Sequence, residues 1–231
     1  MVGNKTLFAE DFESVDVGLT PDPFTSITES GGNDIFQAAV GVGNGAKCTL
    51  AGTATPCYGS KSFTAIPFSR GPIIFTVGHI KVVESGHILN QNFTFFEPRS
   101  ASSHICRLQW KTNADLTSGK LQVVAGFGAA LTTTGTTNIS ENTAFSINIC
   151  IKKSGLILVY LNGGVTPEIS QDNAGAPPDL TAIRVGVTAA SSVPLAGAEV
   201  HIDNIRLSQL IPGGDSGSSI IGLGDMLGRI L

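Results

Sequence analysis

The sequence predicts an all-β protein, a two-sheet antiparallel β-sandwich with a short helical tail at its C-terminal end. Only 14% of the 231 residues are charged, whereas 28 are glycine, a composition typical of β-rich domains with many tight turns. Apolar and polar residues alternate with a period of two in one segment after another, as half-buried strands require. Turn-forming pairs such as Ser154-Gly155 and Asn162-Gly163 separate these segments and favour hairpins.

Eleven segments are alternating or rich in β-branched residues, and we expect each of them to form a strand. In chain order they are 5–12, 46–51, 60–66, 73–83, 87–97, 103–110, 120–127, 144–153, 156–163, 182–189 and 199–207. The polar stretches 27–34 and 131–143 are expected to be exposed loops. No helix of ordinary length can be placed before about residue 215.

Three of these segments indicate how the sandwich packs. In 144–153 the large apolar residues fall on one face and polar residues on the other, so this strand should bury one face against a second sheet. Segment 156–163 is almost continuously apolar, which favours a strand covered on both faces or a packed hairpin partner. Trp110 alternates with Cys106 and Leu108 and is expected in the core.

The chain divides into three parts by composition. Residues 1–210 carry the strand pattern and are expected to form one domain, since sandwiches of this length are common. Residues 211–219 are rich in glycine and serine and predict a flexible spacer. Residues 220–231 are expected to form an amphipathic anchoring segment.

Four cysteines, Cys48, Cys57, Cys106 and Cys150, leave two arrangements open. They can be free thiols that act as small apolar residues, or Cys48 and Cys57 can bridge the short loop between them. A zinc site is not expected, because no pair of cysteines has the close spacing that zinc sites use.

Charge and hydropathy exclude several classes of function. The net charge of −4 offers no basic surface for nucleic acid or an anionic membrane. The sequence has neither an apolar stretch long enough to span a membrane nor a secretory signal at its first residues. We therefore expect no nucleic-acid partner, no membrane, and a location in a virion or other extracellular particle that is released by lysis.

Three motifs carry a resemblance to a known family. They are LFAEDFESVDVG at 7–18, YGSKSFTA at 58–65 and GAEVHIDNIRLSQ at 197–209. Their order and spacing resemble the concanavalin A-like jelly rolls, which include LamG-like domains and carbohydrate-binding modules. The resemblance implies a jelly roll whose first and last strands lie side by side. It also implies a structural Ca²⁺ bound by Glu13, Asp203 and neighbouring backbone carbonyls; the alternative is that these carboxylates face solvent or cap turns.

No catalytic set emerges from the sequence, so the chain is not expected to be an enzyme. Glu199 and Asp203 share a strand face, but their separation of roughly 13 Å is too large for the carboxylate pair of a retaining glycosidase. Glycan binding needs an exposed aromatic ring, and Tyr58, which follows Cys57 in a predicted loop, is the one candidate. A lectin or carbohydrate-binding module is therefore the alternative function, ahead of a glycoside hydrolase.

The last twelve residues predict a partner. Their apolar residues lie on one helical stripe and are Ile220, Ile221, Leu223, Met226, Leu227, Ile230 and Leu231. A helix this short is marginal in water and needs a surface: its own sandwich, a membrane or another subunit. We expect another subunit, reached through the spacer. The preferred function is thus a structural or adhesive component of a larger assembly, most simply a phage decoration, tail-associated or fibre protein.

Overall fold

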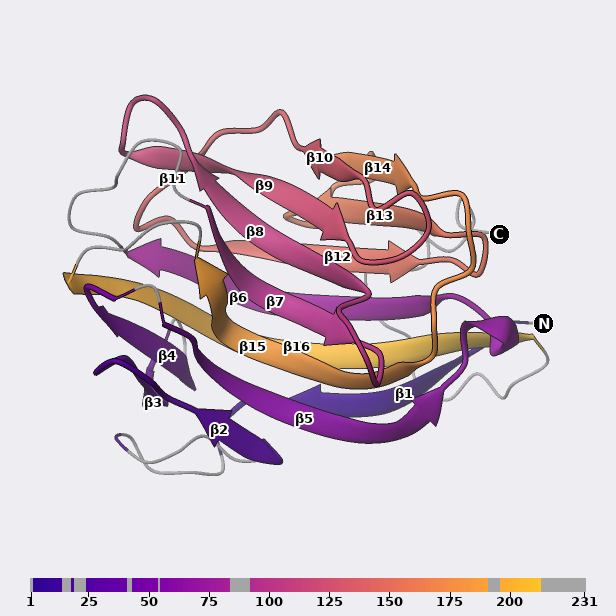
Figure 1. Ribbon diagram of the computed structural model, residues 1–231, viewed down its shortest axis with the longest axis horizontal. Coiled ribbons are helices and arrows are strands. Elements are labelled where there is room, and N and C mark those ends of the chain that lie inside the picture. Colours follow the sequence, from indigo (N-terminus) through magenta and orange to yellow (C-terminus); the bar gives the residue numbers. More distant parts are fainter. Residues whose placement is uncertain are drawn as a thin grey trace.

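The expectation of an all-β sandwich is confirmed. The computed structural model describes residues 2–13, 18, 24–40, 43–53, 55–83, 92–190 and 196–212, which form two antiparallel eight-stranded sheets packed face to face (Figure 1). Within those ranges the structure has strands β1 to β16 and one short 3₁₀ helix, η1 (Phe68–Arg70), which lies between β5 and β6. No helix in this described part of the chain has the length and hydropathy of a membrane span.

The sheet that faces the viewer in Figure 1, here called the front sheet, has the order β10-β9-β8-β7-β15-β5-β2, with β11 beside β9. Its strands are β2 (Ser26–Thr28), β5 (Cys57–Ile66), β7 (Asn92–Arg99), β8 (Cys106–Thr112), β9 (Ser118–Ala125), β10 (Thr132–Thr134), β11 (Ile139–Ser140) and β15 (Leu180–Ala190).

The other sheet, here called the back sheet, has the order β14-β13-β12-β6-β16-β4-β3, with β1 also beside β16. Its strands are β1 (Val2–Glu10), β3 (Asp34–Ala39), β4 (Asn44–Ala51), β6 (Ile73–Val83), β12 (Phe145–Ile151), β13 (Leu156–Leu161), β14 (Ile169–Asp172) and β16 (Ala196–Pro212).

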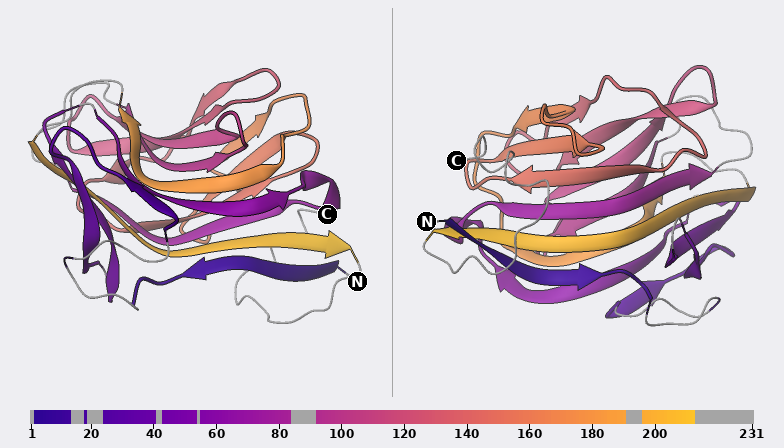
Figure 2. Two further views of the ribbon diagram at one scale, coloured as in Figure 1. Left: turned by 60° about the horizontal axis from the view of Figure 1, so that its bottom comes forward. Right: turned by 180° about the vertical axis from the view of Figure 1, so that it is seen from behind.

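The last described strand, β16, is the long central strand of the back sheet. One of its edges pairs with β6, and the other pairs with β4 along its first half and with β1 along its second half. The first and last strands therefore lie side by side, as expected (Figure 2). β16 runs to Pro212, so regular pairing extends two residues past the predicted domain end at 210.

Strand alternation builds the core. On β12 the side chains of Phe145, Ile147, Ile149 and Ile151 are all at most 4% exposed, which confirms the predicted inward face. Trp110 is fully buried and its indole ring stacks at 6.3 Å on the ring of Phe145 across the two sheets. The core between the sheets is thus one continuous apolar cluster.

The two predicted turns adopt the backbone geometry that their residues favour. Asn162 and Gly163 have φ of 51° and 69°, and the N–H of Gly164 donates to the carbonyl of Leu161 at 2.9 Å, as in a turn that needs two positive φ angles. Gly155, with φ of 97°, closes the turn between β12 and β13.

All four cysteines are free and buried. Cys48 and Cys57 lie on opposite sheets, and the Cys48 thiol donates a hydrogen bond to the Cys57 carbonyl at 3.1 Å instead of forming a bridge. Of the two arrangements that the sequence left open, the structure shows free thiols.

Several sequence predictions fall on residues that the structure does not describe. The expected spacer from residue 213 onward and the expected anchoring segment 220–231, with all seven of its apolar residues, lie outside the described residues. The first residues of the strand expected at 87–97 do as well; the described strand β7 begins at Asn92.

Candidate functional site

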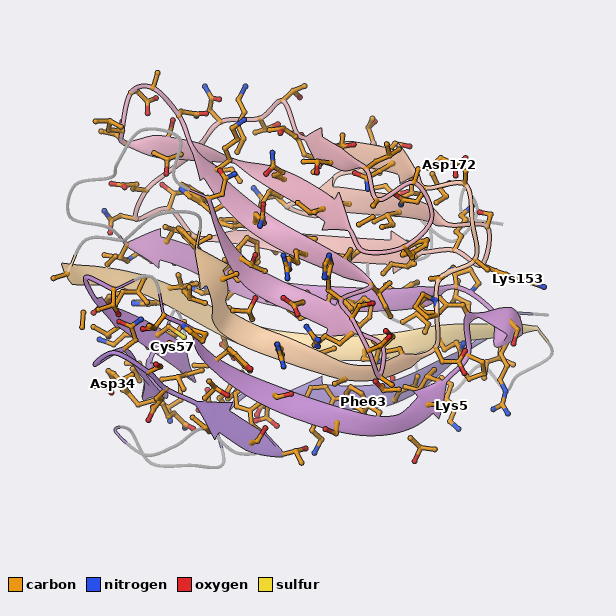
Figure 3. All side chains as sticks on the ribbon, in the orientation of Figure 1. Lys5, Asp34, Cys57, Phe63, Lys153 and Asp172 are labelled. Carbon is orange, nitrogen blue, oxygen red and sulfur yellow. The ribbon has the colours of Figure 1, made fainter. Side chains whose placement is uncertain are left out.

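The outer face of the front sheet carries a band of polar and charged side chains. On β8 the alternation sends Cys106, Leu108 and Trp110 into the core, where they are fully buried. Arg107, Gln109 and Lys111 consequently point outward and are partly exposed. Figure 3 shows nitrogen-bearing side chains standing on this face over β7, β8 and β15.

Three arginines gather around one buried carboxylate at the centre of this face. Glu97 on β7 is 1% exposed. Its carboxylate accepts a hydrogen bond from Arg99, lies 3.3 Å from Nε of Arg107 on β8, and lies 3.7 Å from Nη1 of Arg184 on β15. The hydroxyl of Thr188 donates to Oε2 of Glu97 at 2.9 Å. We call this group of four charged residues the arginine cluster.

Strand register brings the cluster together. Arg184 is directly opposite Glu97 in the pairing of β15 with β7, whereas Arg107 lies on the strand that flanks β7 on its other side. A bulge lies between Thr94, opposite Gln109, and Phe96, opposite Leu108, and makes Phe95 the extra residue of β7. The rings of Phe95 and Phe96 are both fully buried in the core. After this bulge Glu97 returns to the outer face.

The electrostatics of the cluster keep Glu97 charged. Burial raises the pKa of the Glu97 carboxyl, but hydrogen bonds from Arg99 and Thr188 and the charges of Arg99 and Arg107 outweigh burial and hold the pKa below its ordinary value. One negative and three positive side chains leave an excess of two positive charges. The arginine side chains are 20%, 34% and 29% exposed for Arg99, Arg107 and Arg184, so that excess charge meets solvent.

The guanidinium group of Arg184 is also positioned by an aromatic ring of the neighbouring strand. Its guanidinium lies over the ring of Tyr58, 4.5 Å from the ring centroid, a cation–π contact. Nε of Arg184 is buried and has no hydrogen-bond partner among the described residues.

The prediction for Tyr58 is wrong. We expected it in a loop with an exposed ring, but it lies in β5 between β15 and β2 and is only 9% exposed. Tyr58 and the two residues after it, Gly59 and Ser60, are all paired with β15 in the sheet. Tyr58 therefore positions Arg184 and does not offer a platform of its own.

A row of amides and hydroxyls extends from the cluster toward β10. The amide of Gln109 donates to the Thr94 hydroxyl at 3.0 Å, and the amide of Gln122 donates to the Thr134 hydroxyl at 2.8 Å. Gln109 and Gln122 are direct cross-strand partners, and so are Lys111 and Lys120. Two lysines opposite each other repel, which adds to the positive potential of this face.

The acidic corner where the end of β1 meets the middle of β16 is separate from this face. Glu13 accepts a hydrogen bond from the backbone N–H of Asn44 at 2.8 Å, and Asp203 accepts one from the side-chain amide of Asn204 at 2.9 Å. Burial, together with the charges of Glu13, Asp11 and Glu10, raises the pKa of Asp203 to about 6. Carboxylates at the end of β1 and just after it thus disfavour the ionised form of Asp203 on β16.

The calcium site expected at Glu13 and Asp203 stays a prediction, and the contacts of the two carboxylates bear on it. Both carboxylates are engaged by protein N–H donors, and the described residues contain no group of three or more His, Cys, Asp or Glu side chains that could hold a metal ion. The start of β4 also fills this corner: a Cβ on Gly43 would come 2.0 Å from Oε1 of Glu13.

Cys106 directly below the cluster is not a nucleophile. It is fully buried, and burial together with the charge of Glu97 raises the pKa of its thiol to about 12. A thiol in that state stays protonated at neutral pH.

Comparisons with known proteins identify the fold. No family model matches the sequence, and no curated protein matches it. Among solved structures, the binding domain of Paraclostridial Mosquitocidal Protein 1 matches with a TM-score of 0.59 at 11% identity, over 90% of this chain and 49% of that one.

Two further structures match over most of their length. Alginate lyase PA1167 from Pseudomonas aeruginosa has a TM-score of 0.52 at 12% identity, covering 71% of this chain and 82% of that one. Domain 4 of AbnA, an extracellular arabinanase from Geobacillus stearothermophilus solved with arabinotriose, has a TM-score of 0.52 at 16% identity, covering 91% and 95%. At these identities the likeness establishes a β-sandwich of the jelly-roll kind and nothing finer.

Proposed function

We propose that this chain is a carbohydrate-binding domain that holds acidic glycans, those with carboxylate or sulfate groups, across the outer face of the front sheet. The observation that carries the proposal is the arginine cluster: three partly exposed guanidinium groups, positioned by one buried carboxylate, on an otherwise open sheet face. Planar guanidinium groups match carboxylate and sulfate geometry through paired hydrogen bonds.

Polar side chains beside the arginine cluster suit the hydroxyl groups of a glycan. Sugar hydroxyls need amides and hydroxyls as partners, and the partly exposed Gln109 and Thr134 can supply them. Thr94 and Gln122 are buried, at 0% and 6% exposed, and hold these two side chains in place. From β10 to β15 the face spans roughly 19 Å at the usual spacing of strands, enough for an oligosaccharide. Because the one tyrosine here lies under Arg184, charge and hydrogen bonds are expected to provide most of the affinity.

The similar structures agree with this class of ligand without establishing it. One is a domain of an arabinanase solved with arabinotriose and another is an alginate lyase. We propose binding without catalysis, because the carboxylate at the centre of the face is buried and held ionised by arginines, so it has no proton to give. Release of new chain ends from a polyuronate would contradict this part of the proposal.

The first test is binding of a polyuronate oligosaccharide by titration calorimetry, with a neutral glucan of equal length as the comparison. Arg107→Ala should weaken polyuronate binding about tenfold or more, since a charge-assisted hydrogen bond contributes roughly 1.5–3 kcal/mol. Arg107 is chosen because it is the most exposed arginine of the cluster, so its loss disturbs the fold least.

Arg206→Ala is the matched control. Arg206 is a partly exposed arginine on the back sheet, where it donates to the Thr6 hydroxyl at 2.6 Å. The Arg206→Ala substitution should leave polyuronate binding unchanged. Equal affinity for the neutral glucan, or equal loss in the two variants, would overturn the proposal.

A structural role in a virion or similar particle is the second candidate function. The apolar pattern of 220–231 favours it, because a terminal segment of this kind can bind in a groove of another subunit. Removing 213–231 and measuring incorporation into the particle tests it. Normal incorporation of the shortened chain would exclude docking through this segment.

A further inference from the structure

Five apolar side chains are buried on the outer face of the back sheet, away from the core between the sheets. They are Ile74, Cys150, Leu158, Tyr160 and Leu210, with exposed fractions of 3%, 2%, 8%, 4% and 1%. We call this group the outer patch. The neighbours of these residues along each strand, such as Phe75 on β6 and Ile149 on β12, point into the core. Because side chains alternate along a strand, the five residues themselves point to the outer face.

Strand register makes the outer patch continuous. Ile74 on β6 is opposite Cys150 on β12, and Cys150 is opposite Leu158 on β13. Tyr160 lies two residues along the same face of β13. Leu210 on β16 joins at the end of β6, where its N–H donates to the carbonyl of Pro72 at 3.0 Å.

Burial this deep needs a cover, and no strand or helix of the described residues supplies one. Seen from behind, the strands of the back sheet face the viewer, and no other strand or helix of the described residues lies over them (Figure 2). Thr76 and Asn148 occupy the next positions on this face and are partly exposed. Shielding therefore covers the apolar side chains and Ser208, which is opposite Ile74 and 2% exposed, but not the whole face.

The described chain ends beside the outer patch, so the residues that follow are within reach of it. Leu210 belongs to the outer patch, and β16 ends two residues later at Pro212. The seven residues 213–219 have a flexible composition and an expected reach of about 15 Å. They lead directly to 220–231, the most apolar of the segments that lie outside the described residues.

We propose that residues 220–231 dock on the outer patch of their own chain and place their apolar stripe over Cys150, Leu158 and Tyr160. The sizes match: as a helix, twelve residues are about 18 Å long, and the four strands from β16 to β13 span roughly 14 Å. Because the segment is tethered beside the patch, its effective concentration is far above that of any separate partner. This inference does not depend on glycan binding, and it competes with the particle role above, which needs the same segment for another subunit.

Cys150 provides a direct readout. It lies at the centre of the outer patch, and burial raises the pKa of its thiol to about 11. Only the thiolate reacts with alkylating reagents. Access to water therefore speeds the alkylation of Cys150 in two ways: the reagent can reach the sulfur, and the pKa of the thiol falls. Cys48, Cys57 and Cys106 belong to the core between the sheets and report whether the fold is intact.

The experiment measures iodoacetamide labelling of each cysteine by mass spectrometry, in the full chain and in a chain that ends at Pro212. We expect Cys150 to be labelled at least about tenfold faster in the shortened chain, which corresponds to one unit in thiolate pKa. The other three cysteines should stay unlabelled. The double variant Leu223→Ser with Leu227→Ser keeps the length of the chain and should behave like the shortened chain.

Arg229→Gln, a change on the polar side of the same segment, is the control and should leave Cys150 protected. If the shortened chain unfolds, all four cysteines become labelled together, and the double variant then decides the outcome. Equal labelling of Cys150 with and without the segment overturns the proposal. Protection that disappears on dilution also overturns it, because a second copy would then be the cover.

Discussion

Glu97 fixes the geometry of the candidate site through its contacts with three arginines and Thr188. A buried carboxylate is costly unless cations and hydrogen bonds surround it, and here both do. The carboxylate in turn limits repulsion among the three guanidinium groups. Removing the Glu97 carboxylate should therefore lower the free energy of unfolding more than removing any one of the three arginines.

Glu97→Gln is expected to lower the free energy of unfolding at neutral pH by about 3 kcal/mol, since it leaves the arginines without their counter-charge. The pKa of Glu97 in the folded chain is below its ordinary value, so its ionised form stabilises the fold. That contribution is present above about pH 4 and is lost as the pH falls further. Urea unfolding should show wild type and variant converging at low pH; a constant difference at all pH values would contradict this assignment.

Asp203 should have the opposite pH dependence. Its pKa of about 6 in the folded chain lies above its ordinary value, so its ionisation costs stability as the pH rises from about 4 to 6. Asp203→Asn removes this cost, and the unfolding free energy of the variant should improve relative to wild type by ~2–3 kcal/mol across that range. Glu199→Gln, on the same strand but with a lowered pKa, is the comparison and should not show this gain with rising pH.

At the scale of single elements, β15 requires a glycine. Its register against β7 shifts between Val185 and Ala189, and Gly186 within that shift has φ of 111°. A Cβ there would lie 2.6 Å from Sγ of Cys48 and 2.7 Å from the carbonyl oxygen of Cys57. The irregularity precedes Thr188, which donates to Glu97.

Gly186→Ala should cost about 3 kcal/mol or more in unfolding free energy, because it combines an unfavourable φ with a collision in the core. Gly163→Ala is the matched control. Gly163 also has positive φ, but nothing lies within 4 Å of its Cβ position, so only roughly 1 kcal/mol should be lost. Thermal unfolding of both variants tests this, and equal losses would show that crowding at Gly186 is unimportant.

Elements with a long, regular pattern were predictable from the sequence, and short ones were not. Segment 73–83 matches β6, because eleven residues of β-branched and apolar character leave little ambiguity. The regions expected as loops at 27–34 and 131–143 contain parts of β2 and β3, and β10 and β11, respectively. Strands of two or three residues have too few positions to show a period, and they form because a neighbouring strand offers its edge.

At the scale of the whole molecule, the two outer faces differ in character. The front sheet exposes arginines, amides and hydroxyls, whereas the back sheet buries an apolar patch that includes Tyr160. The sequence indicated the second feature, because 156–163 is apolar at consecutive positions. It did not indicate the first, because Glu97, Arg107 and Arg184 come from three strands that only the register brings together.

The charge distribution gives a prediction for the whole molecule. The net charge is −4, yet the front face has a local excess of positive charge at the arginine cluster. Polyuronate affinity should therefore fall steeply as ionic strength rises from about 0.05 to 0.5 M, where the Debye length shortens from roughly 14 to 4 Å. Calorimetry over this salt range tests it, and a salt-independent affinity would contradict charge-driven binding.

The central place of β16 has a consequence for how the protein is made. β6, β4 and β1 all bond to this strand, although it is the last described part to leave the ribosome. The back sheet cannot close before β16 has been synthesised, so the growing polypeptide carries unpaired strand edges until then. Expression is then expected to depend on chaperones that hold nascent chains, and truncations upstream of β16 should be insoluble.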